Sequence, residues 1–258
     1  MDNKNKKNIV LFADYPSGYK ISKYLKKSDK IVALVFAKNK KNILNLNSEK
    51  KIKNIFRSNT KIYKWEDLLK KKNYLKLKKL KPDFFLSINF SKLIPKSIYE
   101  IPKKTLNLHL SYLPHNKGKN PNVWSIINNK PCGVTIHEID SGIDTGKIVV
   151  RKKIIPEVID TGETLWLKCN EEAYNLFKKI WPKYKNGKIK TIKQRKIHEK
   201  INYAKDFKSI SEIKLLKKYS AEKLINILRA KTFNGFPGAI IKKKGKKIEI
   251  KLNLKYIK

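Results

Sequence analysis

Arginine, cysteine and long apolar runs are scarce in this 258-residue chain, and each shortage excludes a class of protein. Only four of its 62 basic residues are arginine, the side chain suited to bidentate contacts with phosphates and guanine edges. Its two cysteines, Cys132 and Cys169, form neither a metal-ligand spacing nor a disulfide framework. No apolar run approaches a membrane span, and the run after the basic N-terminus is too short for a signal-peptide core. We therefore expect a cytoplasmic protein with no metal and no membrane partner.

Lysine is abundant instead, and it gives the chain a formal net charge of +41. A chain this basic often binds nucleic acid or an anionic surface. Here, however, the lysines are spread along the whole sequence among many isoleucines and asparagines, which is typical of a coding bias toward A- and T-rich codons. We favour that bias over a nucleic-acid partner, although a positive surface would attract a phosphorylated substrate on either interpretation.

Short apolar segments alternate with helical patterns through most of the chain. Strands are predicted at 9–14, 31–37, 61–64, 84–88 and 105–110, and helices at 19–26, 65–80, 94–101 and 164–184. Continuous apolar strands of this kind favour a parallel sheet that is covered on both faces. The repeated strand–helix order therefore predicts an α/β fold with a mostly parallel sheet, flanked by helices that form right-handed crossovers.

The C-terminal part has a different pattern and is predicted to be a small appendage. Residues 187–203 form a Lys-rich connector, and a helix that Ser220 can cap follows at 220–231. The segment 239–250 is predicted to be a β-hairpin that turns near Gly245. We therefore place a catalytic domain at 1–203 and a helix and β-hairpin subdomain at 204–258.

Three polar residues form the strongest candidate site. Asn107 and His109 are two positions apart on a predicted strand, so their side chains should share one face of the sheet. Asp144 lies in the glycine-bounded segment 140–146, which could reach the same space. An amide, an imidazole and a carboxylate together supply a donor for a developing oxyanion, a proton acceptor and a charge that tunes it.

The segment Leu106-Asn-Leu-His-Leu-Ser-Tyr-Leu-Pro-His-Asn-Lys-Gly118, followed by Asp140-Ser-Gly-Ile-Asp-Thr-Gly146, resembles the folate-dependent formyltransferase superfamily. The resemblance covers about residues 8–185. It implies a Rossmann-like core, 10-formyltetrahydrofolate as the formyl donor, no metal, and Asn107, His109 and Asp144 as the catalytic residues. Which of His109 and Asp144 is the formal base stays open.

Two further segments are similar to sugar N-formyltransferases. One is Leu113-Pro-His-Asn-Lys-Gly-Lys-Asn-Pro-Asn-Val-Trp-Ser125, with Lys117 where that family usually has arginine, and the other is 228–239. The resemblance implies formylation of a nucleotide-linked amino sugar for lipopolysaccharide O-antigen or another surface glycan, the substrate being dTDP-4-amino-4,6-dideoxyglucose or its 3-amino isomer. The alternative is a methionyl-tRNA formyltransferase, which has a longer C-terminal domain. By analogy, a homodimer would form through 204–258.

The same resemblance extends to binding residues. For the folate it indicates Phe90, Ser91, Lys92, Asp140 and Ile143, and for the sugar nucleotide His115, Lys117, Asn122 and Trp124. Asp140 is also expected to cap its own loop through side-chain hydrogen bonds to the backbone. His137 is predicted to be an exposed or half-buried strand residue without a functional role.

Overall fold

The computed structural model describes residues 6–37, 43–56 and 60–257, which divide into two compact units. Unit 1 consists of Met1–His109, Thr135–Val150 and Ala173–Gln194, and unit 2 of Leu110–Val134, Arg151–Glu172 and Arg195–Lys258. No helix in the described ranges is long and apolar enough to cross a membrane.

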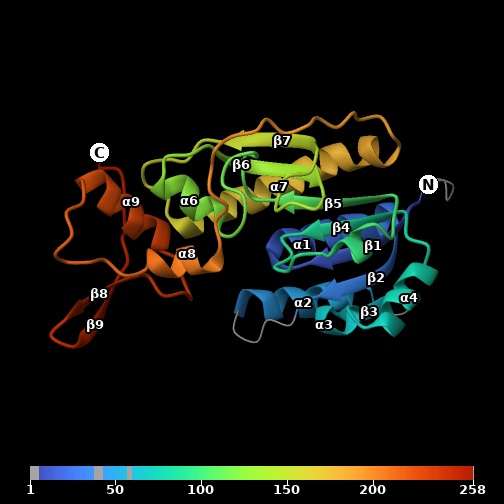
Figure 1. Cartoon of the computed structure of the whole chain (residues 1–258), viewed down its shortest axis with the longest axis horizontal. Helices are drawn as coiled ribbons and strands as arrows, with labels where there is room; N and C mark the ends of the chain where they lie inside the picture. Colours follow the sequence, from blue (N-terminus) through green and yellow to red (C-terminus); the bar gives the residue numbers. More distant parts are fainter. Residues whose placement is uncertain (1–5, 38–42, 57–59, 258) are drawn as a thin grey trace. The chain divides into compact units, whose positions relative to one another are not determined.

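The strands of unit 1 form the predicted mostly parallel sheet. Its strand order is β3-β2-β1-β4-β5-β6-β7, in which β1 to β5 are parallel and β6 runs antiparallel to β5 (Figure 1). The strands are β1 (Asn8–Ala13), β2 (Lys30–Phe36), β3 (Lys61–Lys64), β4 (Phe84–Ile88), β5 (Lys104–His109), β6 (Cys132–Glu138) and β7 (Ile148–Ile154). This confirms the predicted fold class, with β6 and β7 divided between the two units.

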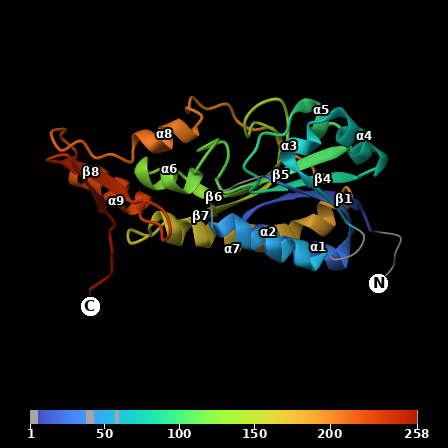
Figure 2. The same cartoon turned by 90° about the horizontal axis from the view of Figure 1, so that it is seen from below.

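Helices cover both faces of this sheet, which explains why its inner strands β1, β2 and β4 are largely apolar. Figure 2 shows α1 (Tyr15–Ser28) and α2 (Ile43–Ile55) on one face, and α3 (Trp65–Leu68), α4 (Lys71–Lys79) and α5 (Lys96–Tyr99) on the other. On the α3–α5 face, the rings of Phe12, Trp65 and Phe90 pack within 5.4 to 6.4 Å of one another. On the α1 face, Phe177 and Trp181 of α7 (Gly162–Lys185) stack at 5.5 Å.

The helix predicted at 65–80 is wrong, because the structure has two helices there. In a continuous helix the carbonyl of Asp67 would accept a hydrogen bond from the backbone N–H of Lys71. Instead it accepts from the Asn73 side chain at 2.8 Å and from the Lys70 N–H at 3.2 Å, and Lys70 has an extended backbone. A local side-chain bond thus replaces the helical bond and ends α3.

Unit 2 contains the predicted C-terminal helix and hairpin. Its complete elements are α6 (Pro121–Ile127), α8 (Ala204–Ser209), α9 (Ala221–Lys231), β8 (Ala239–Lys243) and β9 (Lys246–Ile250). The Ser220 Oγ accepts from the Lys223 N–H at 3.2 Å and caps α9 as expected. Lys244 and Gly245 have positive φ values of 47° and 72°, which is typical of a tight hairpin turn. Helix α8 was not predicted, and the proposed boundary between 203 and 204 stays a prediction.

Candidate active site

A row of polar side chains crosses three neighbouring strands in unit 1. Asn107 of β5 is in register with Ser87 of β4 on one side and with His137 of β6 on the other. His109 lies two residues after Asn107, so both side chains share a face, as the sequence predicted. Three strands therefore contribute adjacent polar groups to one row of the sheet.

The Asn107 amide is held at both of its ends. Its Oδ1 accepts from the Ser87 Oγ at 2.8 Å, while its Nδ2 lies 3.2 Å from His137 Nε2 and 3.4 Å from Asp144 Oδ1. A hydroxyl donor at one end and two acceptors at the other fix which atom is oxygen and which is nitrogen. The hydrogen bond from Asn107 Nδ2 to Asp144 is long, so it is weak. The Nδ2 hydrogen in this bond therefore remains available to an oxygen that gains negative charge.

Asp144 places its carboxylate between two imidazoles. His109 Nε2 lies 3.6 Å from Asp144 Oδ2, and His137 Nε2 lies 3.5 Å from Asp144 Oδ1. All these groups are largely shielded from solvent, since the side chains of His109, His137 and Asp144 are 10%, 2% and 14% exposed. A carboxylate beside two imidazoles is an arrangement that can accept a proton and pass it on.

His137 lies beside this cluster, and the prediction that it is exposed or half-buried is wrong, because its side chain is 2% exposed. Its Nδ1 lies 2.8 Å from the carbonyl oxygen of Glu138, an acceptor that requires Nδ1 to carry the hydrogen. In the neutral ring Nε2 is then the acceptor that faces Asn107. Its alternation with Thr135 on β6 was the available signal, but only the pairing of β6 with β5 places it beside Asn107.

The predicted folate residues have different environments in unit 1. Phe90 is 9% exposed and lies within the aromatic core described above, whereas Lys92 is exposed. The Ser91 N–H lies 3.4 Å from Asp14 Oδ2. Asp140 caps its loop as expected, because its Oδ1 accepts from the Gly142 N–H at 3.1 Å and from the Thr145 hydroxyl at 2.6 Å. Ile143 is half-buried in the same loop.

The predicted substrate loop belongs to unit 2 and is fixed by a segment that sequence reasoning treated as a connector. His115 Nδ1 lies 2.7 Å from Glu199 Oε1, and Lys130 Nζ lies 3.1 Å from the same oxygen. Burial raises the pKa of the Glu199 carboxyl, but the contacts with His115 and Lys130 outweigh burial and hold that pKa below its usual value. The Lys117 carbonyl accepts from the Asn202 N–H at 3.0 Å. Residues 195–203 thus hold His115 and the backbone of Lys117 in place.

Asn122 and Trp124 lie on α6 and are both buried in unit 2. The Asn122 Nδ2 donates to the Gly162 carbonyl at 2.8 Å, so this amide links α6 to the start of α7. Trp124 is 7% exposed, and its indole Nε1 has no hydrogen-bond partner among the described residues. A buried donor without a partner costs free energy, which makes Trp124 the stronger candidate of the two for contact with a bound molecule.

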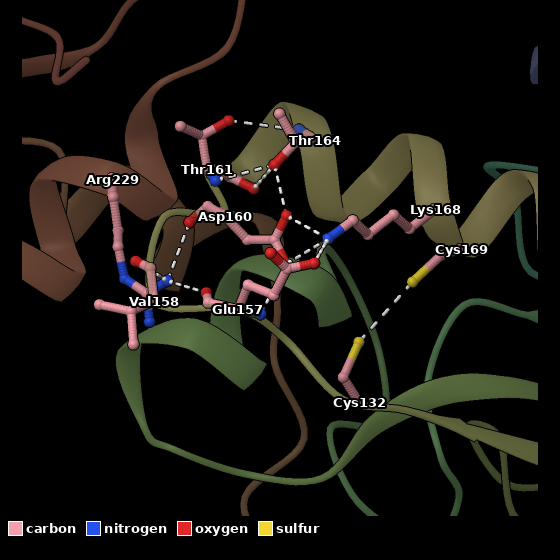
Figure 3. A network of polar contacts seen from close by, with 9 residues as sticks. All are labelled: Cys132, Glu157, Val158, Asp160, Thr161, Thr164, Lys168, Cys169 and Arg229. Carbon is pink, nitrogen blue, oxygen red and sulfur yellow. Dashed lines mark hydrogen bonds and ion pairs between the residues drawn. The ribbon is translucent and has the colours of Figure 1, made fainter. Parts of the chain in front are cut away.

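A second polar network in unit 2 surrounds the buried carboxylate of Asp160 (Figure 3). This carboxylate accepts from the Glu157 N–H at 2.7 Å, from the Thr164 hydroxyl at 2.8 Å and from Lys168 Nζ at 3.0 Å. Burial raises the pKa of Asp160, but these three donors together outweigh burial and hold the pKa below its ordinary value. The carboxylate is therefore stably ionised and fully hydrogen-bonded.

Arg229 of α9 completes this network from the other side (Figure 3). Its guanidinium donates to the backbone carbonyls of Glu157, Val158 and Asp160 at 2.9 to 3.0 Å, and to Asn226 Oδ1 at 2.8 Å. The side chain thereby joins α9 to the loop that precedes α7.

Near this network, Cys132 Sγ and Cys169 Sγ lie 3.6 Å apart. Within the described residues, no cluster of three or more His, Cys, Asp or Glu side chains could hold a metal ion.

The chain is similar to known proteins over most of its length. Residues 7–180 match the family model described as formyl transferase, and residues 206–256 match the model described as N-formyltransferase dimerization C-terminal domain. The chain is 37% identical over 164 residues to a methionyl-tRNA formyltransferase from Thermodesulfovibrio yellowstonii, an alignment that covers 62% of this chain and 52% of the relative. The chain thus spans about half the length of the first curated relatives that it matches.

Solved structures match over more of the chain. A 4-N formyltransferase from Francisella tularensis superposes with a TM-score of 0.82 and 27% identity, over 98% of this chain and 100% of that one. A formyltransferase from Anoxybacillus kamchatkensis, solved with UDP-4,6-dideoxy-4-formamido-L-AltNAc and tetrahydrofolate, matches with a TM-score of 0.56 and 29% identity, over 78% of this chain and 88% of that one.

Proposed function

Because this chain belongs to the formyl transferase family, we propose that it transfers a formyl group from 10-formyltetrahydrofolate to the amino group of a nucleotide-linked amino sugar. The observation that carries the proposal is the cluster in which Asp144 lies between His109 and His137, beside the Asn107 amide. The preference for a sugar acceptor rests on the match with the Anoxybacillus formyltransferase, which was solved with a UDP-linked formamido sugar, and the Francisella 4-N formyltransferase matches over nearly the full length of the chain.

Within this proposal, His109 and Asp144 act as one proton-handling pair. The attacking amine must lose a proton as its nitrogen bonds to the formyl carbon, and the pair lies where one group can accept that proton while the other stabilises the resulting charge. The bond from the formyl carbon to the folate nitrogen breaks, and the proton passes to that nitrogen. When bound, the folate supplies the activated formyl group, and no metal is needed.

Asn107 would stabilise the charge that develops on the formyl oxygen. Its Nδ2 carries the hydrogen that is weakly engaged by Asp144, and Ser87 and His137 hold the amide in place. A donor that is already oriented needs no reorganisation when the oxygen becomes negative, which is the property that makes oxyanion donors effective. The strand register and the hydrogen-bond directions support this proposed role.

The acceptor is proposed to bind through unit 2. We assign His115, Lys117 and Trp124 to the sugar nucleotide, with Lys117 as a point charge for a phosphate. Gly118 has a φ of +93°, and a Cβ there would meet the Asn202 carbonyl at 2.2 Å, so the position requires glycine, and its backbone is held by a bridge to Asn202. A loop fixed in this way loses less conformational entropy when a ligand binds. The 4-amino position is favoured over the 3-amino isomer by the same Francisella relative.

We also propose that residues 204–258 form a homodimer interface. Two-stranded sheets such as β8–β9 are marginally stable alone, and this part of the chain exposes several large apolar side chains. They are Leu215, Leu216, Ile225, Ile248, Tyr256 and Ile257. Light scattering coupled to size-exclusion chromatography should give the mass of a dimer, and a monomeric mass at micromolar concentration would contradict this.

A cytoplasmic location and a role in surface glycan synthesis follow as part of the proposal.

A methionyl-tRNA formyltransferase is the second candidate, favoured by the 37% identity to a relative of that name. The two are separated by incubating the protein with 10-formyltetrahydrofolate and either methionyl-tRNA or a panel of dTDP-, UDP- and GDP-linked 3- and 4-amino sugars. Mass spectrometry should show formylation of one sugar nucleotide, abolished in His109→Ala. Formylation of methionyl-tRNA with no reaction on any sugar would overturn the sugar proposal.

A further inference from the structure

Gln194 lies in a segment that passes beside β7 after α7 has ended at Lys185. The segment is held there by an isolated bridge, in which the backbones of Ile148 and Ile192 exchange hydrogen bonds at 2.7 and 2.8 Å. Gln194 is the only glutamine in the sequence. Its long amide side chain therefore extends from a backbone whose position the sheet itself fixes.

The side-chain amide of Gln194 forms two hydrogen bonds with the backbone of the Asp144 loop. Its Nε2 donates to the carbonyl oxygen of Asp144 at 2.9 Å and to that of Gly146 at 2.8 Å. Both hydrogens of the amide nitrogen are thus used, one on each side of Thr145. The opposite orientation would place Oε1 against two carbonyl oxygens, so the hydrogen-bond network itself fixes the amide.

The loop needs such a restraint because Asp144 has an unfavourable backbone conformation. Its φ of +53° lies in the left-handed region, which is unfavourable for a residue with a Cβ. On one side the loop is closed by Asp140, which binds Gly142 and Thr145. On the other side the two carbonyls held by Gln194 define the orientation of the peptide groups around Asp144.

We propose that Gln194 is a positioning residue that holds the Asp144 carboxylate in place for proton transfer, an inference that rests on the proposed formyl transfer. A rotation of the peptide groups at Asp144 would move both carboxylate oxygens relative to His109 Nε2 at 3.6 Å and Asn107 Nδ2 at 3.4 Å. These contacts are already long, so a small displacement would break them. Gln194 is not expected to contact the acceptor.

The test uses Gln194→Met, which keeps the length of the side chain and removes both donors. We expect kcat to fall about tenfold to a hundredfold, the cost of a displacement of roughly 1 Å at a reacting group. The KM for the amino sugar should stay unchanged, because the acceptor is proposed to bind in unit 2. The acid limb of the kcat profile should move to lower pH, because a displaced carboxylate no longer favours a protonated imidazole. A purely structural role would not move that limb.

Two further variants and one independent measurement complete the test. Lys193→Met introduces the same residue at the exposed neighbouring position and should behave as wild type. Gln194→Glu should be more impaired than Gln194→Met, since its carboxylate would face two carbonyl oxygens. Hydrogen exchange measured by mass spectrometry should show faster exchange across 140–146 in Gln194→Met and no change in Lys193→Met.

The outcomes separate this inference from the proposed function. If wild-type protein formylates no acceptor, the proposed function fails, while hydrogen exchange still shows whether Gln194 restrains the loop. If wild-type protein is active and Gln194→Met keeps the wild-type kcat, pH profile and exchange rates, the inference is overturned. A lower melting temperature with an unchanged pH limb would also contradict it, because that result describes a structural residue alone.

Discussion

Two buried carboxylates, Asp144 in unit 1 and Asp160 in unit 2, have opposite environments. Asp160 accepts three hydrogen bonds of 2.7 to 3.0 Å, one of them from the permanently charged Lys168. The neighbours of Asp144 described above are an amide and two imidazoles at 3.4 to 3.6 Å. Imidazoles can gain and lose protons near neutral pH, whereas a lysine ammonium keeps its own. Short, saturated contacts indicate a structural network, and longer contacts to titratable groups indicate chemistry.

The comparison is tested most directly by making the same substitution at both carboxylates. We expect Asp144→Asn to lower kcat about a thousandfold, as for loss of a proton-handling group, with little change in melting temperature. Asp160→Asn should leave the kcat of the folded protein unchanged and lower the free energy of unfolding by about 2 kcal/mol, because it disturbs buried hydrogen bonds. The measurements are initial rates and urea unfolding. Equal losses of activity in both variants would contradict the assignment of a catalytic role to Asp144 and a structural role to Asp160.

Within the Asp160 network, the substitution of Arg229 should lower the free energy of unfolding the most. Arg229→Met keeps much of the apolar side chain but leaves three carbonyls and Asn226 Oδ1 without their donor, which should destabilise the protein by about 3 kcal/mol. The urea midpoint should fall with little change in slope. Arg195→Met, at an exposed arginine, is the matched control and should unfold as wild type. An unchanged midpoint in Arg229→Met would show that the network is not structural.

On the catalytic side, His137 should have a smaller effect than Asp144, because it acts through Asn107. His137→Leu removes the acceptor that holds the Asn107 amide, and we expect kcat to fall about tenfold, roughly 1.4 kcal/mol. Ser87→Ala removes the donor at the other end of the same amide and should act in the same direction. Steady-state kinetics at saturating acceptor would measure both. Wild-type kcat in both variants would remove His137 and Ser87 from the positioning of Asn107.

The smallest expected effect is on stability in acid. The pKa of Asp160 is lower in the folded protein than its ordinary value, so its stabilising contribution is complete above about pH 4 and is lost as pH falls through the folded value. Melting temperatures measured from pH 6 down to pH 3 should therefore converge for wild type and Asp160→Asn at the acid end. A constant difference across that range would show that the carboxylate charge does not stabilise the fold.

Features that depend on a few consecutive residues were predictable from the sequence. Alternation with a period of two placed Asn107 and His109 on one face of a strand, and the structure confirms that strand as β5. Ser220 and Gly245 marked the start of α9 and the hairpin turn for equally local reasons. The break between α3 and α4 was missed, because it depends on a side-chain bond from Asn73 that competes with a helical pattern.

Local patterns could not reveal which distant side chains meet, because strand order, register and packing decide this together. His137 reaches Asn107 only because β6 pairs antiparallel to β5, and a shift of one residue would turn it to the other face. Gln194 reaches the Asp144 loop because Ile192 pairs with Ile148, and Arg229 reaches the Asp160 loop across 69 positions of sequence. The sequence by itself thus determined the strands and the chemical groups of the site, and only the tertiary structure decided which residues hold those groups in place.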